Sequence, residues 1–133
     1  MPIFLENAYE AKADCVTVHG SDAVLESLKR DIFNDRTWPD FVAMSGGPAP
    51  FLKLERLEPG RPLEVEGLRI TPIPVNHVVP TMGFLVEDGR TAVLIASDTG
   101  PTDLLWARAK AYAGIDAVSI RGSHHRTDIA AGV

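Results

Sequence analysis

The sequence has one cysteine, few aromatic residues and no excess of basic charge, and these shortages exclude several classes of protein. Cys15 is alone, so no intramolecular disulfide and no Cys-x-x-Cys zinc or redox site can form. Its place before Val16 favours a buried structural thiol over a reactive one. The chain has 13 Lys and Arg against 18 Asp and Glu, a formal net charge of −5. Because a protein that binds long nucleic acids usually presents a basic face, this balance argues against that partner.

Long hydrophobic runs are also absent. No apolar stretch approaches the roughly 20 residues of a membrane-spanning helix, and Glu6 and Glu10 interrupt the N-terminal region, so no signal peptide is expected. The composition, 45% hydrophobic and 23% charged, is typical of a folded protein. A cytoplasmic protein with no membrane partner is therefore predicted, and its 133 residues suffice for one domain at most.

The middle of the chain predicts consecutive β-strands. The pattern predicts a hairpin of residues 63–65 and 68–75 around Glu66-Gly67, and residues 83–87 form the next β-rich run. Asp88-Gly89 is the strongest short hairpin signal. Residues 91–96 are almost continuously apolar, which predicts a strand buried on both faces.

Helical patterns are fewer than strand patterns. A short helix is expected in the first dozen residues, a second begins after Ser21 as its N-cap, and a third covers residues 102–111. Further short strands are expected at residues 14–19, 51–57 and 116–120. This succession suits one half of a sandwich of sheets flanked by helices.

Two metal-ligating side chains stand where strands of this region end. His77 follows the strand over residues 68–75, and Asp98 follows the strand over residues 91–96. A neutral imidazole and a carboxylate suit a divalent ion such as zinc or manganese, and two-metal hydrolases use such ions to cut phosphodiesters. From the residues alone, His77 is more often a hydrogen-bonded histidine, and Asp98 is more often a turn or cap residue.

The motifs around this pair resemble those of a known family. They are Pro-x-Asn-His at residues 74–77, Val-Pro-Thr-x-Gly-Phe at 79–84 and Ser-Asp-Thr-Gly-Pro-Thr at 97–102, preceded by Asp-Ile-Phe-Asn-Asp at 31–35 and Trp-Pro-Asp-Phe at 38–41. Together they are similar to the metallo-β-lactamase fold, and specifically to its class II cyclic-nucleotide phosphodiesterases. The resemblance covers roughly residues 1–118.

The resemblance implies an α/β fold, a partial αββα sandwich of mixed β-sheets flanked by helices, as a single partial domain over residues 1–133. It implies hydrolysis of 3′,5′-cyclic nucleotides such as cyclic AMP to 5′-monophosphates with a divalent metal, most commonly zinc, with manganese or iron as alternatives. His77 takes the place of the third metal-binding motif and Asp98 that of the bridging aspartate. Asn76 and Thr81 could orient His77 or touch the substrate phosphate, although turn roles are more common for both.

The chain also departs from the family. The His-x-His-x-Asp-His motif, which supplies most ligands, does not occur in it, and residues 119–133 form a divergent tail that could be disordered. His124 and His125 in that tail are expected to be surface residues and not substitute ligands. The chain therefore resembles the middle of a longer enzyme, and we expect it to be weakly active or inactive, with no residue assigned a certain catalytic role and the metal itself in question.

Two other functions remain open. A relative of the tRNA 3′-processing endonucleases would share the strand-end histidine and the Ser-Asp-Thr motif, but the acidic balance and residues 38–41 favour the cyclic-nucleotide branch. A non-catalytic association module would retain the sheets and form homodimers through exposed strand edges.

Overall fold

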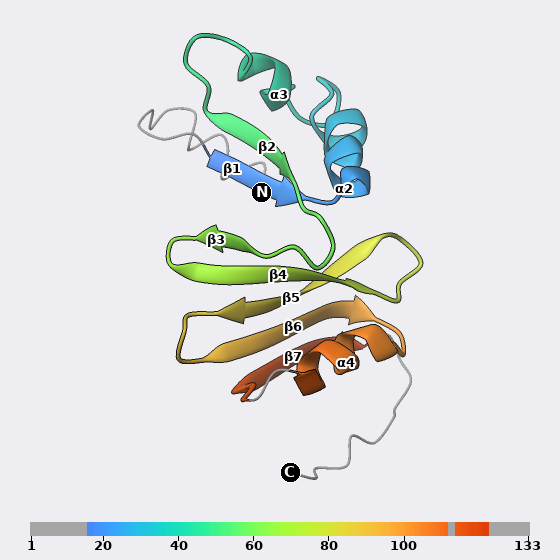
Figure 1. Cartoon of the computed structure of the whole chain (residues 1–133). Helices are drawn as coiled ribbons and strands as arrows, with labels where there is room; N and C mark the ends of the chain where they lie inside the picture. The colour runs from blue at the N-terminus through green and yellow to red at the C-terminus, as the bar shows by residue number, and fades with distance from the viewer. Residues whose placement is uncertain (1–15, 112–113, 123–133) are drawn as a thin grey trace. The chain divides into compact units, whose positions relative to one another are not determined.

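The computed structural model describes residues 16–111 and 114–122. Its contacts divide the chain into two compact units, unit 1 (residues 1–58) and unit 2 (residues 59–133), which are described separately (Figure 1). The helix expected in the first dozen residues, Cys15, His124 and His125 lie outside the described residues. The single domain expected from the sequence stays a prediction.

In its described part, residues 16–58, unit 1 contains a two-stranded sheet and three short helical segments. Strand β1 (Val16–Gly20) pairs in parallel with β2 (Leu52–Arg56), and both lie within the ranges where strands were expected apart from Gly20. Helix α2 (Asp22–Ser27) begins after Ser21, whose hydroxyl accepts the N–H of Val24 and confirms the predicted N-cap. A π-helical turn (Leu28–Ile32) and helix α3 (Phe41–Met44) complete the connection to β2.

The core of unit 1 is built from aromatic side chains. Phe33, Phe41 and Phe51 are buried, with edge-to-face ring pairs at centroid distances of 5.4 and 6.1 Å. Buried Ser45 ties helix α3 to β2, because its hydroxyl donates to the carbonyl of Leu52 at 2.8 Å and accepts the N–H groups of Phe51 and Leu52. These three rings thus stabilise this small unit.

The described residues of unit 2 form a five-stranded mixed sheet with one helix against it. The strands follow one another across the sheet in chain order and are β3 (Leu63–Val65), β4 (Leu68–Val75), β5 (Thr81–Glu87), β6 (Ala92–Thr99) and β7 (Ala117–Gly122). The first four are antiparallel, and β7 is parallel to β6 after the crossover helix α4 (Asp103–Ala111). The predicted hairpins at Glu66-Gly67 and Asp88-Gly89 are both present.

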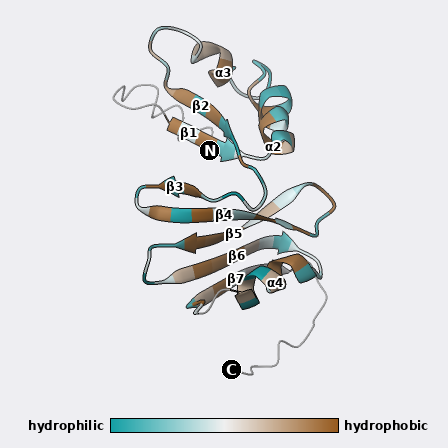
Figure 2. Ribbon diagram, in the orientation of Figure 1, coloured by the Kyte–Doolittle hydropathy of each residue, from teal (hydrophilic) through white to brown (hydrophobic). Residues whose placement is uncertain are grey.

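Strand β6 corrects the expectation of a strand buried on both faces. Ala92, Leu94 and Ala96 are buried and pack with Leu105 of α4, whereas Ile95 on the other face is 38% exposed. The physical reason is that the core of unit 2 lies on the side of the sheet that α4 covers. Figure 2 shows the change along β6 from hydrophobic residues to a hydrophilic end, where Asp98 lies.

The last described strand overlaps the region predicted as a divergent tail. Residues 119–122 belong to β7, and residues 123–133 lie outside the described part of the chain. None of the described helices is long and apolar enough to cross a lipid bilayer.

Candidate metal centre

His77 and Asp98 lie beside each other at one end of the sheet of unit 2. His77 stands in the turn between β4 and β5, and Asp98 is the penultimate residue of β6. His77 Nε2 is 3.6 Å from Asp98 Oδ2, and the two side chains are 24% and 47% exposed. The structure thus brings together the two residues that the sequence singled out, with both polar ends accessible to solvent.

The pair does not come from adjacent strands, because β5 lies between β4 and β6. Both β4 and β6 run antiparallel to β5, so their carboxyl ends reach the same edge of the sheet. The backbone pairing of β5 with β6 covers residues 84–87 and 92–95. Beyond it, Thr99 and Gly100 at the end of β6 hydrogen-bond to Asn76 in the turn after β4.

A bulge in β6 redirects the strand just before Asp98. The register to β7 shifts between Ile95 and Ser97, and Ser97 adopts a φ of 59°. Its hydroxyl donates to the carbonyl of Met82 at 2.9 Å, which holds the bulge against β5. Bulges change the direction in which the following side chain points, and this one places the Asp98 carboxylate toward His77.

Asn76 joins the two strand ends that carry the pair. The N–H of Gly100 donates to the Asn76 carbonyl at 2.7 Å, and the Asn76 N–H donates to Thr99 Oγ1 at 3.2 Å. The Asn76 side-chain amide donates to the carbonyl of Pro101 at 3.0 Å. Its side-chain N–H group therefore has a partner within the fold, and the local geometry gives Asn76 a structural role.

Thr81 faces the other ring nitrogen of His77. Its Oγ1 is 3.4 Å from Nδ1 and donates to the carbonyl of Val79 at 2.9 Å, so the oxygen can accept a hydrogen bond from Nδ1–H. The Val79 N–H also approaches Nδ1, at 3.5 Å. In the Nδ1–H tautomer the ring donates to Thr81 Oγ1 and leaves the Nε2 lone pair directed toward Asp98, whereas an Nδ1 that accepts the Val79 N–H places the proton on Nε2.

The donor chemistry of this pair fits part of a metal shell. Two ligand atoms about 2.1 Å from a tetrahedral ion are about 3.4 Å apart, close to the observed separation of 3.6 Å. Among the residues described, no group of three or more His, Cys, Asp and Glu side chains gathers at one place. His19, in unit 1, pairs instead with Glu55 at 3.6 Å. A catalytic zinc site usually has three protein ligands, so this pair supplies only some of them.

Comparisons with known proteins agree with this architecture. The model of the family described as "Beta-lactamase superfamily domain" matches residues 4–129. Three solved structures share the fold at low sequence identity. They are unliganded yeast PDE1 (17% identity, TM-score 0.72, 90% of this chain and 39% of that chain), zinc-bound PqqB from Methylobacterium extorquens (18%, 0.59, 89% and 42%) and the metallo-β-lactamase fold protein YhfI from Bacillus subtilis (19%, 0.56, 76% and 36%).

The mixed sheet, the flanking helices and these likenesses define an α/β protein of the metallo-β-lactamase fold, which confirms the fold class expected from the sequence. The chain belongs to the beta-lactamase superfamily domain family. It spans between 36% and 42% of the length of the three structures it resembles. A comparison with curated proteins gave no match.

Proposed function

We propose that the chain is part of a metal-dependent phosphodiesterase that hydrolyses 3′,5′-cyclic nucleotides to 5′-monophosphates, with His77 and Asp98 as two of the metal ligands. The observation that carries the proposal is the 3.6 Å separation of His77 Nε2 and Asp98 Oδ2 at the end of the sheet. Membership of the beta-lactamase superfamily domain family supports the hydrolase class.

The residues of the chain have distinct parts in this proposal. His77 would offer the Nε2 lone pair, and Thr81 would hold the proton on Nδ1. Asp98 would offer a carboxylate oxygen, aimed by the bulge at Ser97. Asn76 would keep the two strand ends together through its bonds to Thr99, Gly100 and Pro101. A divalent ion, when bound, supplies Lewis acidity that polarises a phosphoryl oxygen and acidifies water.

The choice of a cyclic nucleotide rests on the motifs of the sequence. Residues 74–77, 79–84 and 97–102 are the segments that are similar to the class II phosphodiesterases, and they form the candidate site. Yeast PDE1 shares the fold over 90% of the chain. We propose zinc as the first metal to test, with manganese and iron as alternatives.

Metal content of the purified, tag-free chain tests the proposal. If the pair binds zinc, elemental mass spectrometry after loading should find metal in the parent chain and loss of metal in His77→Ala and Asp98→Ala. His19→Ala is the matched control and should retain the metal, because His19 pairs with Glu55 in unit 1. A metal-free parent, or equal loss in the control, would overturn the assignment of the pair. Turnover of cyclic AMP by the loaded chain is expected to be weak or absent, since the His-x-His-x-Asp-His motif does not occur in it.

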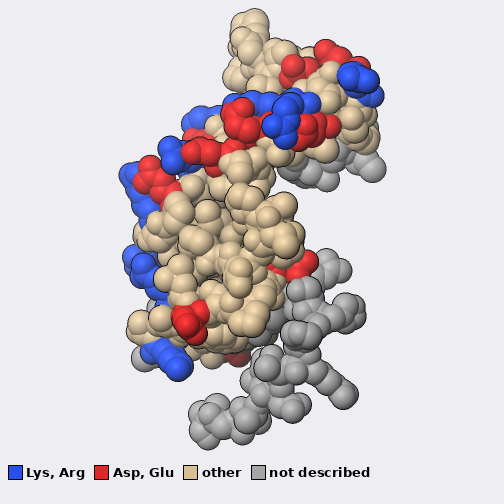
Figure 3. Space-filling model, turned by 90° about the vertical axis from the view of Figure 1, so that its right-hand side faces the viewer, with Lys and Arg blue, Asp and Glu red and all other residues tan. Residues whose placement is uncertain are grey.

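The alternative substrate, a tRNA 3′ end, is less well supported. Lys and Arg side chains are interspersed with Asp and Glu on the face of the molecule in Figure 3 and do not gather into a basic patch there. The net charge of −5 also argues against a nucleic-acid substrate. Binding of tRNA with a steep salt dependence would reverse this preference.

A further inference from the structure

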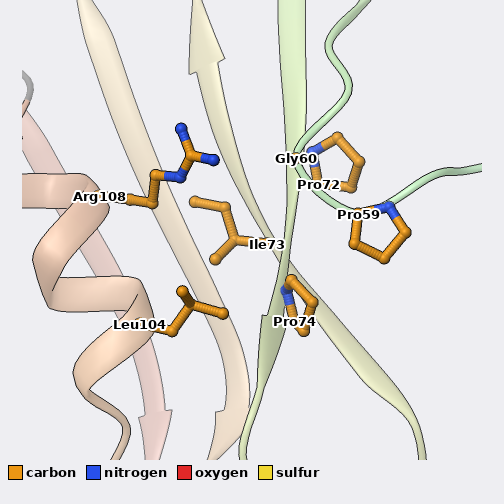
Figure 4. Close-up of a pocket in the computed structure, with 7 residues that line it drawn as sticks. All are labelled: Pro59, Gly60, Pro72, Ile73, Pro74, Leu104 and Arg108. Atoms are coloured by element: carbon orange, nitrogen blue, oxygen red, sulfur yellow. The ribbon is translucent and has the colours of Figure 1, made fainter.

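A groove on unit 2 lies outside the candidate metal centre. It is formed between the free edge of β4, the turn before β3 and the exposed side of α4, and it has a volume of about 140 Å³ (Figure 4). The residues that line it are Pro59, Gly60, Pro72, Ile73, Pro74, Leu104 and Arg108. Pro74 begins the 74–77 segment of the candidate metal centre, and the other six lining residues lie outside the three segments that form that centre.

The walls of the groove are apolar and rigid. Three of the seven lining residues are prolines, whose ring fixes the backbone φ angle. Pro72 and Ile73 are almost completely buried, and the Gly60 N–H donates to the Pro72 carbonyl at 2.8 Å. A ligand would therefore meet a preformed surface, and little conformational entropy would be lost in ordering it.

The groove has charge at one place only. Arg108 is the one charged residue that lines it, and its guanidinium reaches from α4 toward Gly60 and Pro72 (Figure 4). A Cβ atom added at Gly60 would lie 3.3 Å from Arg108 Nη2, so a larger residue at Gly60 would crowd the guanidinium. No ion pair joins Arg108 to another residue within the described part of the chain. The guanidinium is thus available to an anion.

Leu104 lies one helical turn before Arg108 on the same face of α4 and is 51% exposed. Together with Ile73 and Pro74 it forms the apolar part of the groove next to the guanidinium (Figure 4). An apolar cavity of about 150 Å³ is large enough for a benzene ring. The space therefore suits a six-membered ring or a short branched chain.

We propose that this groove binds a small amphipathic monocarboxylate, with the carboxylate on Arg108 and a ring or short aliphatic body over Leu104 and Pro74. A guanidinium pairs with a carboxylate through two parallel hydrogen bonds, which explains the preference for a planar anion. A single guanidinium neutralises one negative charge, and a neutral apolar molecule would leave it without a partner. This proposal does not depend on a metal bound at His77 and Asp98.

Phenylacetate is the probe that tests the site on the full chain. Two-dimensional NMR with methyl labelling should show saturable shifts at Leu104 and Ile73, with a dissociation constant on the order of 1 mM for a ligand of this size. Phenylacetamide, which has the same shape without the charge, should bind about tenfold more weakly or worse, because it lacks the charge-assisted hydrogen bonds.

Two variants separate the site from non-specific binding. Arg108→Gln should weaken phenylacetate binding by about tenfold or more, whereas Lys110→Gln, which removes a positive charge from the same helix outside the groove, should leave it unchanged. Leu104→Ala is a second groove variant that should also weaken binding. Because the Leu104 side chain is half exposed, this substitution should leave the fold intact. Absence of saturable shifts at about 10 mM phenylacetate, equal binding of acid and amide, or unchanged binding to Arg108→Gln would each overturn the proposal.

Discussion

At the scale of single residues, the tautomer of the His77 imidazole decides whether Nε2 donates a hydrogen bond to Asp98 or is free to bind a metal. If Nδ1 of His77 accepts the N–H of Val79, Nε2 carries the proton and is directed at Asp98 as a donor. If Nδ1 carries the proton, Thr81 accepts it and Nε2 is free to bind a metal. Thr81 is therefore a positioning residue in our proposal.

Thr81→Val should weaken zinc binding without removing it. Loss of a partner behind a ligating histidine typically costs about tenfold or more in metal affinity. Competition with a chromophoric chelator would measure the change, and Thr17→Val, an exposed substitution on β1 in unit 1, is the matched control. Equal zinc affinity of Thr81→Val and the parent would show that the hydroxyl does not orient His77.

Gly83 is a residue whose lack of a side chain the sheet requires. It is buried on β5 opposite Ile73, and a Cβ atom there would lie 2.8 Å from the Ile95 carbonyl oxygen and 3.2 Å from Val75 Cγ1. Backbone atoms of β6 would have to move to accommodate it.

Gly83→Ala should lower the free energy of unfolding by about 1–3 kcal/mol, as overpacking in a sheet core does. Urea denaturation followed by circular dichroism measures the change. Gly47→Ala should have a much smaller effect, because a Cβ atom at that loop position meets nothing within 4 Å. An unchanged midpoint for Gly83→Ala would contradict the close approach of the two strands.

At the scale of secondary-structure elements, the β5–β6 hairpin depends on one carboxylate. Asp88 accepts the backbone N–H groups of Thr91 at 2.7 Å and Arg90 at 2.9 Å, and its own N–H donates to the Thr91 carbonyl at 3.2 Å. The hydrogen bond from Thr91, and next that from Arg90, lowers the pKa of the Asp88 carboxyl from its ordinary value of 3.8. The charged form is therefore favoured in the folded chain.

This lowered pKa predicts an acid-sensitive hairpin. A depressed folded-state pKa contributes stability that is complete above the unfolded value near 3.8 and is lost as the pH falls through the folded value. Asp88→Asn should therefore be less stable than the parent at pH 7, and the difference should shrink as the pH falls below 3.8. Urea midpoints measured across this range test it, and a difference that stayed constant with pH would contradict it.

The edge of β4 that faces away from β5 affects whether two copies of the chain can pair strand to strand. Strand β3 covers only residues 68–70 of β4, and the next stretch carries Pro72 and Pro74. Proline has no N–H to offer a further strand, so it blocks pairing of an edge. We therefore expect this part of the β4 edge not to pair with a second copy of the chain, and the groove described above occupies the same place.

At the scale of the whole molecule, the two units have separate hydrophobic cores. The core of unit 2 gathers Ile73, Leu85, Leu94, Ala96 and Leu105, whereas that of unit 1 is centred on Phe33, Phe41 and Phe51. Leu94 has no exposed surface. Loosening one core should therefore affect its own unit first.

Leu94→Ala should destabilise unit 2 by about 2–5 kcal/mol, through lost burial and the cavity left behind. Hydrogen exchange followed by mass spectrometry should show faster exchange in β4, β5 and β6 and little change in β1 and β2. Equal acceleration in both units would show that they unfold together and would contradict their independence.

The sequence alone determined those features that depend on neighbouring residues. The Asp88-Gly89 hairpin, the hairpin at Glu66-Gly67, the Ser21 cap and the boundaries of β3 and β4 follow from local turn and capping chemistry, so they were predictable. Helix α3 was missed because its four residues are too few to show a helical period, although Asp40 after Pro39 was an available capping signal.

Only the tertiary structure decided features that depend on residues far apart in the chain. The partial exposure of Ile95 depends on which face of the sheet α4 covers, and the approach of His77 to Asp98 depends on how far β6 stays paired with β5. The groove at Arg108 likewise joins a turn, a strand edge and a helix that no local pattern relates. Periodicity and turn preferences report the conformation of a few consecutive residues, whereas these contacts are set by the packing of whole elements.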